Sequence, residues 1–181
     1  SIIQNKCVPI CSLKKDIIAQ SQSGTGKTGA FTIGMLNNLD INLKRTQYIV
    51  VVPTHELAEQ IFEVTTELSK YIDVSIVKVI GKTNISQSIN ELSKDPQIII
   101  STPGRLYDMI SRKYIFTDNL KALILDEADE MLSIGFLDNI KEIIRSISKE
   151  TNIYLFSATL PKDIIELTTF FMKDPIKLLI N

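Results

Sequence analysis

Histidine and cysteine are scarce in this chain of 181 residues, which has one histidine, His55, and two cysteines, Cys7 and Cys11. The two cysteines are spaced as i and i+4, but a zinc site would need further ligands, and neither a third cysteine nor a second histidine exists. We therefore expect two reduced, half-buried thiols in an intracellular protein of the cytoplasm or the nucleus.

Long apolar runs and an excess of one charge are also absent. No run is long enough to cross a membrane, and no basic segment leads into an apolar one at the start, so neither a span nor a secretory signal is expected. The 20 basic and 21 acidic residues give a formal net charge of -1. Any binding to nucleic acid must then come from a local arrangement. The chain begins at Ser1 without a methionine, as expected of a fragment.

Short apolar runs alternate with amphipathic segments, as in α/β proteins. The strand candidates are Asp16–Ala19, Gln47–Val52, Val74–Ile80, Gln97–Ser101, Ala122–Asp126, Asn152–Phe156 and Ile176–Ile180. Helical spacing is clearest in two sets, Leu57, Ile61, Val64 and Leu68, and Leu137, Ile140, Ile144 and Ile147. Thr102 before Pro103, and Thr159 before Pro161, are helix-start signals. The pattern predicts one domain over residues 1–181, with a mostly parallel sheet of about seven strands and helices on both faces.

A loop with two glycines follows the first expected strand. It reads Ser21-Gln22-Ser23-Gly24-Thr25-Gly26-Lys27-Thr28 and leads into a helical pattern. Strand, loop and helix start are the setting of a P-loop, where backbone N–H groups and the positive helix end surround phosphate oxygens. Lys27 is expected to reach the β- and γ-phosphates of ATP, and the Thr28 hydroxyl to ligate Mg²⁺. The alternative, a serine-glycine loop with an unrelated lysine, is disfavoured by this setting.

Two adjacent carboxylates follow the apolar strand that begins at Ala122, in the segment Asp126-Glu127-Ala128-Asp129. Asp126 is expected to hold Mg²⁺ opposite Thr28, and Glu127 to orient and deprotonate the attacking water. An acidic run is also typical of a solvated helix N-terminus. The strand before it and the P-loop upstream favour the Walker B interpretation.

With these motifs in place, the sequence resembles the DEAD-box family of ATP-dependent RNA helicases over essentially its whole length. Asp126–Asp129 is the motif that names the family. The other matching segments, in family order, are Ser1–Gln4, Pro53–Ala58, Thr102–Arg105 and Ser157–Thr159. Within the family, these segments resemble most closely those of the translation initiation factor 4A subgroup. The resemblance implies a RecA-like P-loop domain that uses ATP and Mg²⁺ and binds RNA without reading its bases.

The resemblance also implies roles for individual residues. Gln4 would read the edge of adenine, because an amide can both donate and accept a hydrogen bond. Asp129, Ser157 and Thr159 would belong to the catalytic group, the last two in the motif that links the ATP state to RNA unwinding. The residues expected to hold RNA phosphates and sugars are Pro53, Thr54, His55, Gly81, Lys82, Thr102, Gly104 and Arg105. Thr54 and Thr102 are also expected as helix caps.

The sequence departs from the family pattern at three places. His55 stands where the family has arginine. An imidazole there replaces a guanidinium group, which is always charged and donates several hydrogen bonds. Lys82 stands where a second glycine is common after Gly81, so the local turn is in doubt. The aromatic residue expected before Gln4 lies outside the chain. The first two departures concern the grip on RNA.

The resemblance further implies a second RecA-like domain, which has no counterpart in these residues and would supply arginine fingers. We therefore expect this half alone to bind nucleotide and to turn it over poorly. Protein cofactors are expected as further partners, and no membrane. An ATP-gated RNA clamp or scaffold that does not unwind remains open as an alternative function. Another P-loop ATPase, such as a transporter subunit, is disfavoured because the sequence has no transporter signature motif and does have Gln4.

Overall fold

A computed structural model describes residues 2–180, apart from the side chains of Ile3 and Ile180. The helices are α1 (Ile2–Cys11), α2 (Lys27–Asn38), α3 (His55–Leu68), α4 (Ile85–Leu92), α5 (Pro103–Ser111), α6 (Ala128–Ile134), α7 (Leu137–Ser146) and α8 (Lys162–Phe171). The strands are β1 (Ile17–Ser21), β2 (Tyr48–Val51), β3 (Ile76–Val79), β4 (Ile98–Ser101), β5 (Ala122–Leu125), β6 (Asn152–Ser157) and β7 (Ile176–Ile180). Each expected strand is present, with limits that differ by at most two residues.

The seven strands form one sheet in the order β3-β4-β2-β5-β6-β1-β7. All strand pairs are parallel, so every strand ends at the same edge of the sheet. The runs in β2, β4 and β5 are buried at every position because helices cover both faces. The predicted parallel α/β fold is confirmed.

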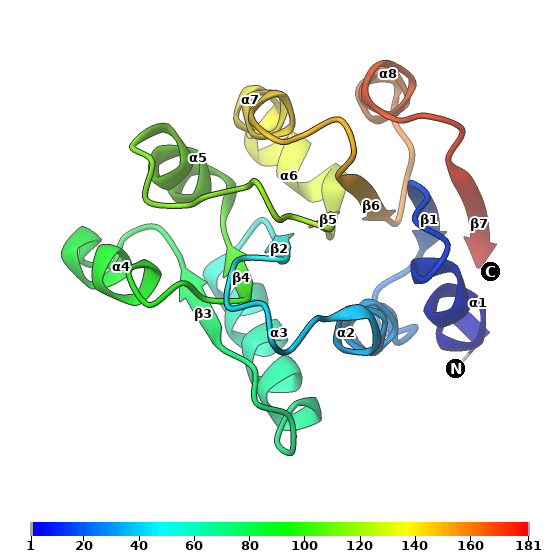
Figure 1. Ribbon diagram of the computed structural model, residues 1–181. Coiled ribbons are helices and arrows are strands. Elements are labelled where there is room, and N and C mark those ends of the chain that lie inside the picture. The colour runs from blue at the N-terminus through cyan, green and yellow to red at the C-terminus, as the bar shows by residue number, and fades with distance from the viewer. Residues whose placement is uncertain (1, 181) are drawn as a thin grey trace.

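Two apolar layers flank the sheet (Figure 1). Helices α1, α2 and α3 cover one face, where Phe31 and Met35 of α2 pack on alternate strand residues such as Val50. Helices α4 to α8 cover the other face, where Leu106 and Ile140 pack on Ile49 and its neighbours. Burial on both sides accounts for the β-branched runs in the strands.

Three details differ from the sequence prediction. Cys7 and Cys11 are buried and free, with exposures of 0% and 6%, so the expectation of half-buried thiols was wrong. The cause is Gly34 of α2, which lets α1 approach so closely that a Cβ there would lie 2.7 Å from Cys11 Sγ. Burial raises the pKa of Cys7 to about 11 and that of Cys11 to about 12, which leaves both thiols unreactive.

The buried face of α3 is turned relative to the predicted stripe. Ala58, Ile61 and Thr65 are buried, whereas Val64 and Leu68 are 38% and 44% exposed. Thr159 does not cap the helix that was predicted to start near Pro161, because Pro161 itself is the N-cap of α8. Among residues 2–180, no helix combines the length and the apolar character that a membrane span requires.

Candidate functional site

The P-loop is a turn between β1 and α2 at the carboxyl edge of the sheet. β1 ends at Ser21 and α2 begins at Lys27. Gly24 and Gly26 have φ angles of +81° and +93°, a region that costs glycine little and other residues more. The Thr25 hydroxyl donates to the Gln22 carbonyl oxygen at 2.9 Å and braces the turn from within.

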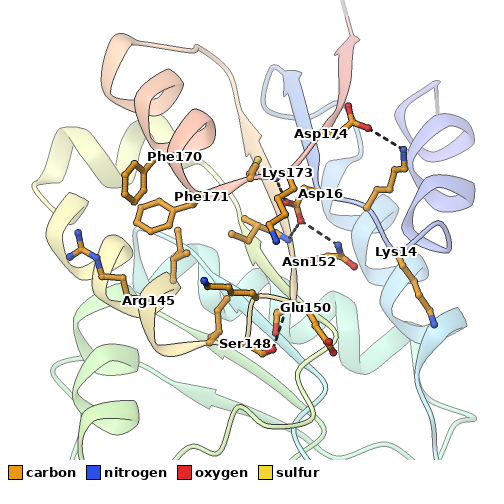
Figure 2. Close-up of a pocket in the computed structure, with 17 residues that line it drawn as sticks. Lys14, Asp16, Arg145, Ser148, Glu150, Asn152, Phe170, Phe171, Lys173 and Asp174 are labelled. Atoms are coloured by element: carbon orange, nitrogen blue, oxygen red, sulfur yellow. Dashed lines mark hydrogen bonds and ion pairs between the residues drawn. The ribbon is translucent and has the colours of Figure 1, made fainter.

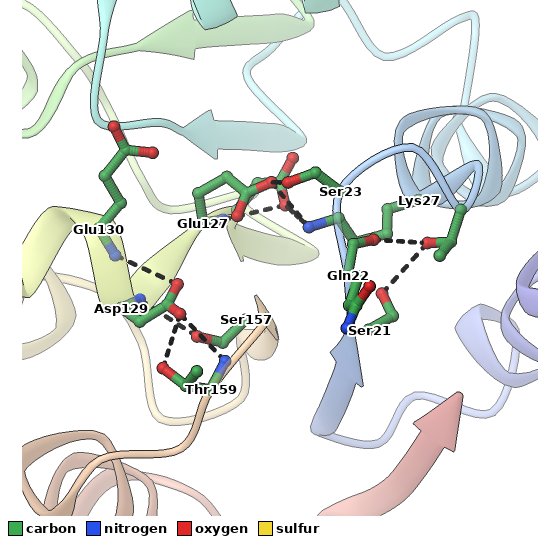
Figure 3. Close-up of polar contacts among 11 residues, drawn as sticks. Ser21, Gln22, Ser23, Lys27, Glu127, Asp129, Glu130, Ser157 and Thr159 are labelled. Carbon is green, nitrogen blue, oxygen red and sulfur yellow. Dashed lines mark hydrogen bonds and ion pairs between the residues drawn. The ribbon is translucent and has the colours of Figure 1, made fainter. Parts of the chain in front are cut away.

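A buried charge cluster joins the P-loop to the end of β5. Lys27 Nζ lies 2.8 Å from Glu127 Oε1 and 3.6 Å from Asp126 Oδ1. The side chains of Lys27 and Asp126 are only 4% and 5% exposed. The Ser23 hydroxyl also donates to Glu127 Oε1, at 3.2 Å (Figure 3). The convergence expected from the sequence is therefore present, and the lysine lies between the two carboxylates.

The environment of Asp126 disfavours its charge. Burial raises the pKa of Asp126 to about 6, and the neighbouring Glu127 adds to the rise, while Lys27 opposes it. Glu127 itself has a φ of +53° as the N-cap of α6. Strained backbone of this kind persists where surrounding contacts hold it, and here the Glu127 N–H donates to Asp126 Oδ1 at 3.0 Å.

Asp129 connects the start of α6 to the end of β6. Its Oδ2 accepts hydrogen bonds from the Thr159 hydroxyl at 2.7 Å and from the Thr159 N–H at 3.0 Å. Its own N–H donates to the Ser157 hydroxyl at 3.1 Å (Figure 3). Partial burial acts to raise the pKa of Asp129, but the hydrogen bonds from Thr159 and Ser157 outweigh it and lower the pKa. The three residues form one connected unit beside the charge cluster.

The residues expected to hold RNA follow β2, β3 and β4, on the neighbouring part of the same edge. The Gly81 N–H donates to Thr102 Oγ1 at 3.2 Å, and a Cβ on Gly81 would lie 3.7 Å from His55 Nε2. Three separate loops therefore meet there. Thr54 accepts from the Leu57 N–H and caps α3 as predicted. Thr102 stands at the N-cap of α5 without a capping bond, because its hydroxyl is used by Gly81.

Arg105 is tied into the same rim by contacts that the sequence did not indicate. Its guanidinium donates to the Ser88 hydroxyl at 2.8 Å and to the Thr83 carbonyl oxygen at 2.9 Å. No spacing relates Arg105 to Ser88, so no sequence signal could have found this pair. Lys82 is exposed with a φ of +58°, so the turn forms in a conformation that glycine would adopt more readily.

The remaining rim residues lie at helix starts. Pro53 is buried directly before Thr54, and Gly104 is half-buried in the first turn of α5. A Cβ at Gly104 would meet no atom within 4 Å, so the space over this helix start is open. Backbone N–H groups in such a position are suited to phosphate.

Residues 1–167 match the DEAD/DEAH box helicase family. The chain belongs to this family. It is 44% identical to an ATP-dependent RNA helicase eIF4A of Neosartorya fischeri over 100% of the chain and 46% of that protein. It is 45% identical to an eIF4A of Lodderomyces elongisporus over the same shares. The predicted family and the predicted similarity to initiation factor 4A are confirmed. Membership of this family excludes the transporter alternative. The chain spans about half the length of these relatives.

Solved structures carry the same fold. A DEAD box protein from the hyperthermophile Methanococcus jannaschii superimposes with a TM-score of 0.95 at 35% identity, over 99% of this chain and 49% of that one. A hypothetical ATP-dependent RNA helicase from Sulfolobus tokodaii gives a TM-score of 0.88 at 30% identity, over 98% and 52%. Both are DEAD-box or helicase proteins, and the expected RecA-like fold is confirmed.

The donor set of this DEAD-box chain fits a magnesium ion held mainly by substrate and water. Within residues 2–180, no group of three or more His, Cys, Asp or Glu side chains could hold a metal. The carboxylates of Asp126 and Glu127 and the hydroxyl of the half-buried Thr28, in the first turn of α2, offer oxygen atoms beside the P-loop. Mg²⁺ commonly uses one or two carboxylates, waters and phosphates, so the set is sufficient.

Gln4 is placed beside the helix that follows the P-loop. Its Nε2 lies 2.7 Å from the position that a Cβ on Gly29 would occupy, so the absence of a side chain at Gly29 makes room for the amide. Gln4 is half-buried in α1. Ser1, the first residue of the matching segment Ser1–Gln4, lies outside the described residues.

Proposed function

We propose that this chain is the domain of an ATP-dependent RNA helicase that binds ATP with Mg²⁺ and hydrolyses it while holding RNA. The observation that carries the proposal is the position of Lys27 Nζ, within 3.6 Å of both Asp126 and Glu127 at the end of a P-loop. A buried lysine paired with adjacent carboxylates at a phosphate-binding turn is suited to phosphoryl transfer, where positioning and charge do most of the work.

The ion pair between Lys27 and Glu127 must open when nucleotide binds. Lys27 then donates to the β- and γ-phosphate oxygens, in place of Glu127 Oε1. The released Glu127 carboxylate orients a water and accepts its proton as the water attacks the γ-phosphate. Mg²⁺, held by Asp126 and Thr28, would neutralise charge on the phosphates. Asp129 is hydrogen-bonded to Ser157 and Thr159, so a movement of α6 on nucleotide binding would be transmitted to the end of β6.

RNA is proposed to lie along the rim at the ends of β2, β3 and β4. The groups presented there are helix starts, hydroxyls and the cations Lys82 and Arg105, which suit phosphates and sugars and leave bases unread. The relatives are named ATP-dependent RNA helicases, which supports RNA as the ligand. A cytoplasmic or nuclear location is part of the same proposal.

A second RecA-like domain is the proposed partner, because the chain corresponds to 46% of its eIF4A relatives. That domain would supply positive charge to the transition state, which no arginine beside Lys27 and Glu127 provides within the described residues. Protein cofactors remain a prediction.

The test joins this chain to a C-terminal RecA-like domain of an eIF4A relative and measures ATP hydrolysis and duplex separation. We expect RNA to stimulate hydrolysis and ATP to drive separation of a short RNA duplex, with Lys27→Ala inactive in both assays. A clamp would retain RNA in the presence of ATP without separating strands. Hydrolysis that does not respond to RNA would refute the proposal.

A further inference from the structure

A second hollow lies at the opposite edge of the sheet from the P-loop. It has a volume of about 690 Å³ and lies where β1, β6 and β7 begin (Figure 2). Pockets of roughly 300–1,000 Å³ are typical of binding sites. None of the residues assigned to ATP or RNA lines it, so it is unexplained by the proposed function.

Part of the lining of the hollow is apolar and one wall is aromatic. Ile147, Ile153 and Met172 line the hollow together with the polar residues Ser148, Thr151 and Asn152. Phe170 and Phe171 form the wall, with their rings edge to face at 4.9 Å, and Phe170 is 77% exposed. An exposed aromatic side chain next to a concave surface is a candidate site for contact with another molecule.

The aromatic wall also borders a neighbouring hollow of about 300 Å³ between α7 and α8. Arg145, Phe170 and Phe171 line both hollows. Arg145 lies with its guanidinium carbon 6.0 Å from the Phe171 ring centre. Two adjoining hollows separated by one ridge suit an extended segment of polypeptide better than one small molecule.

The charges around the larger hollow favour an acidic ligand. Five cationic side chains line it, Lys14, Lys15, Arg145, Lys149 and Lys173, against three carboxylates, Asp16, Glu150 and Asp174. Within residues 2–180, no ion-pair partner faces Lys14, Lys149 or Lys173, whereas Lys15 pairs with Asp174 and Arg145 with Glu142.

Asp16 does not offset these lysines, because its carboxylate is used inside the protein. It is 8% exposed and accepts hydrogen bonds from the Ile153 N–H at 2.8 Å and from the Lys173 N–H at 3.0 Å. The carboxylate thereby fixes the loop before β7 against the start of β6. The free cations consequently exceed the free anions at the mouth of the hollow.

We propose that this hollow docks an acidic segment of a partner protein, which places a bulky apolar side chain in the hollow against Phe170. Its carboxylates would meet Lys14, Lys149 and Lys173. We favour a protein segment over RNA because Ile147, Ile153 and Met172 in the lining suit an aliphatic side chain, which a nucleotide does not have. The surface lies at the edge opposite the site of hydrolysis, so occupancy leaves the P-loop accessible.

The test titrates the chain with a short blocked peptide in which a Leu-Phe pair is flanked by glutamates. Amide NMR shifts of Ser148, Ile153 and Lys173 locate the contact, and fluorescence anisotropy gives the affinity. We expect saturation below about 100 µM. The charge-reversal pair Lys149→Glu with Lys173→Glu should weaken binding at least about tenfold, since each exposed charge pair contributes up to about 1 kcal/mol.

Matched controls separate recognition from net charge. The pair Lys70→Glu with Lys113→Glu makes the same change of charge elsewhere and should leave the affinity within about twofold. A peptide with glutamines in place of glutamates should bind at least about tenfold more weakly, and Phe170→Ala should abolish the dependence on the Leu-Phe pair. Any of four results overturns the proposal: no shifts at these amides, equal binding of both peptides, tighter binding of single-stranded RNA to this face, or self-association through it.

Discussion

The two halves of one sheet edge are built differently. At the ends of β1, β5 and β6, charged side chains contact one another and are buried, as the 4% exposure of Lys27 illustrates. At the ends of β2, β3 and β4, the Gly81 N–H, the Thr102 hydroxyl and the His55 imidazole meet, and Lys82 is exposed next to them. The departures from the family pattern at His55 and Lys82 fall in the second half.

Burial makes the expected cost of a substitution different in the two halves. Removing one member of a buried ion pair leaves an uncompensated charge and costs about 3–5 kcal/mol. An exposed contact to a phosphate contributes far less and is screened by salt. A substitution in the half of the edge assigned to hydrolysis is therefore expected to cost more than one in the half assigned to RNA.

The largest expected effect comes from adding positive charge to the buried half. Joining a C-terminal RecA-like domain to residues 1–181 should raise kcat with saturating RNA by about 10³ to 10⁵, because an arginine finger contributes on that scale. The linker keeps the added domain at high effective concentration. A value of kcat for the short chain within about tenfold of the joined protein would mean that no second domain is needed.

Adenine preference should be sensitive to space beside Gly29. Gly29→Ala introduces a Cβ 2.7 Å from Gln4 Nε2 and should displace that flexible amide. We expect the preference for ADP over GDP to fall about tenfold, the worth of one hydrogen bond or slightly more, while the helix becomes no less stable because alanine favours it. Calorimetry with both nucleotides measures the ratio, with GDP affinity as the internal control.

Gln4→Ala is the matched variant and should lower the same ratio. An unchanged ratio in Gln4→Ala would remove Gln4 from adenine recognition, whatever Gly29→Ala does.

Acid should stabilise the fold through Asp126. Burial raises its pKa from 3.8 to about 6, so between pH 6 and 4 the folded chain holds a proton that the unfolded chain lacks. Stability from this group is therefore gained as the pH falls, by roughly 1 kcal/mol between pH 7 and pH 5. Urea unfolding without metal or nucleotide, compared with Asp126→Asn, isolates the effect. If the free energy of unfolding depended on pH in the same way in both proteins, the pKa of Asp126 would not be raised by burial.

The smallest effect is expected in the exposed half. Lys82 has a φ of +58°, which costs a residue with a Cβ about 1–2 kcal/mol. Lys82→Gly removes this strain, but glycine is also more flexible in the unfolded chain. We therefore expect the free energy of unfolding to rise by only about 0.5 kcal/mol. Lys82→Ala keeps the Cβ and serves as the control in the same urea titration. Equal stability of the two variants would show that the turn is unstrained.

Local patterns determined most of what could be predicted. The strand β4 and the turn of the P-loop could be predicted from a few neighbouring residues, because strand burial and positive φ angles depend on local sequence. Contacts between distant segments carry no such signal. The bonds from Arg105 to Ser88 and from Gly81 to Thr102 were not predictable, nor was the burial of Cys11 against Gly34, because each depends on how separate elements pack.

The central claim is that the buried half serves hydrolysis and the exposed half holds RNA. It is tested most directly by measuring kcat and the half-saturating RNA concentration on one two-domain protein with two substitutions. Glu127→Gln should lower kcat by about 10² to 10⁴, the usual contribution of a general base, with RNA half-saturation unchanged. Lys82→Glu should raise RNA half-saturation several-fold with kcat unchanged. A fall in kcat from Lys82→Glu that matched the fall from Glu127→Gln would contradict the division.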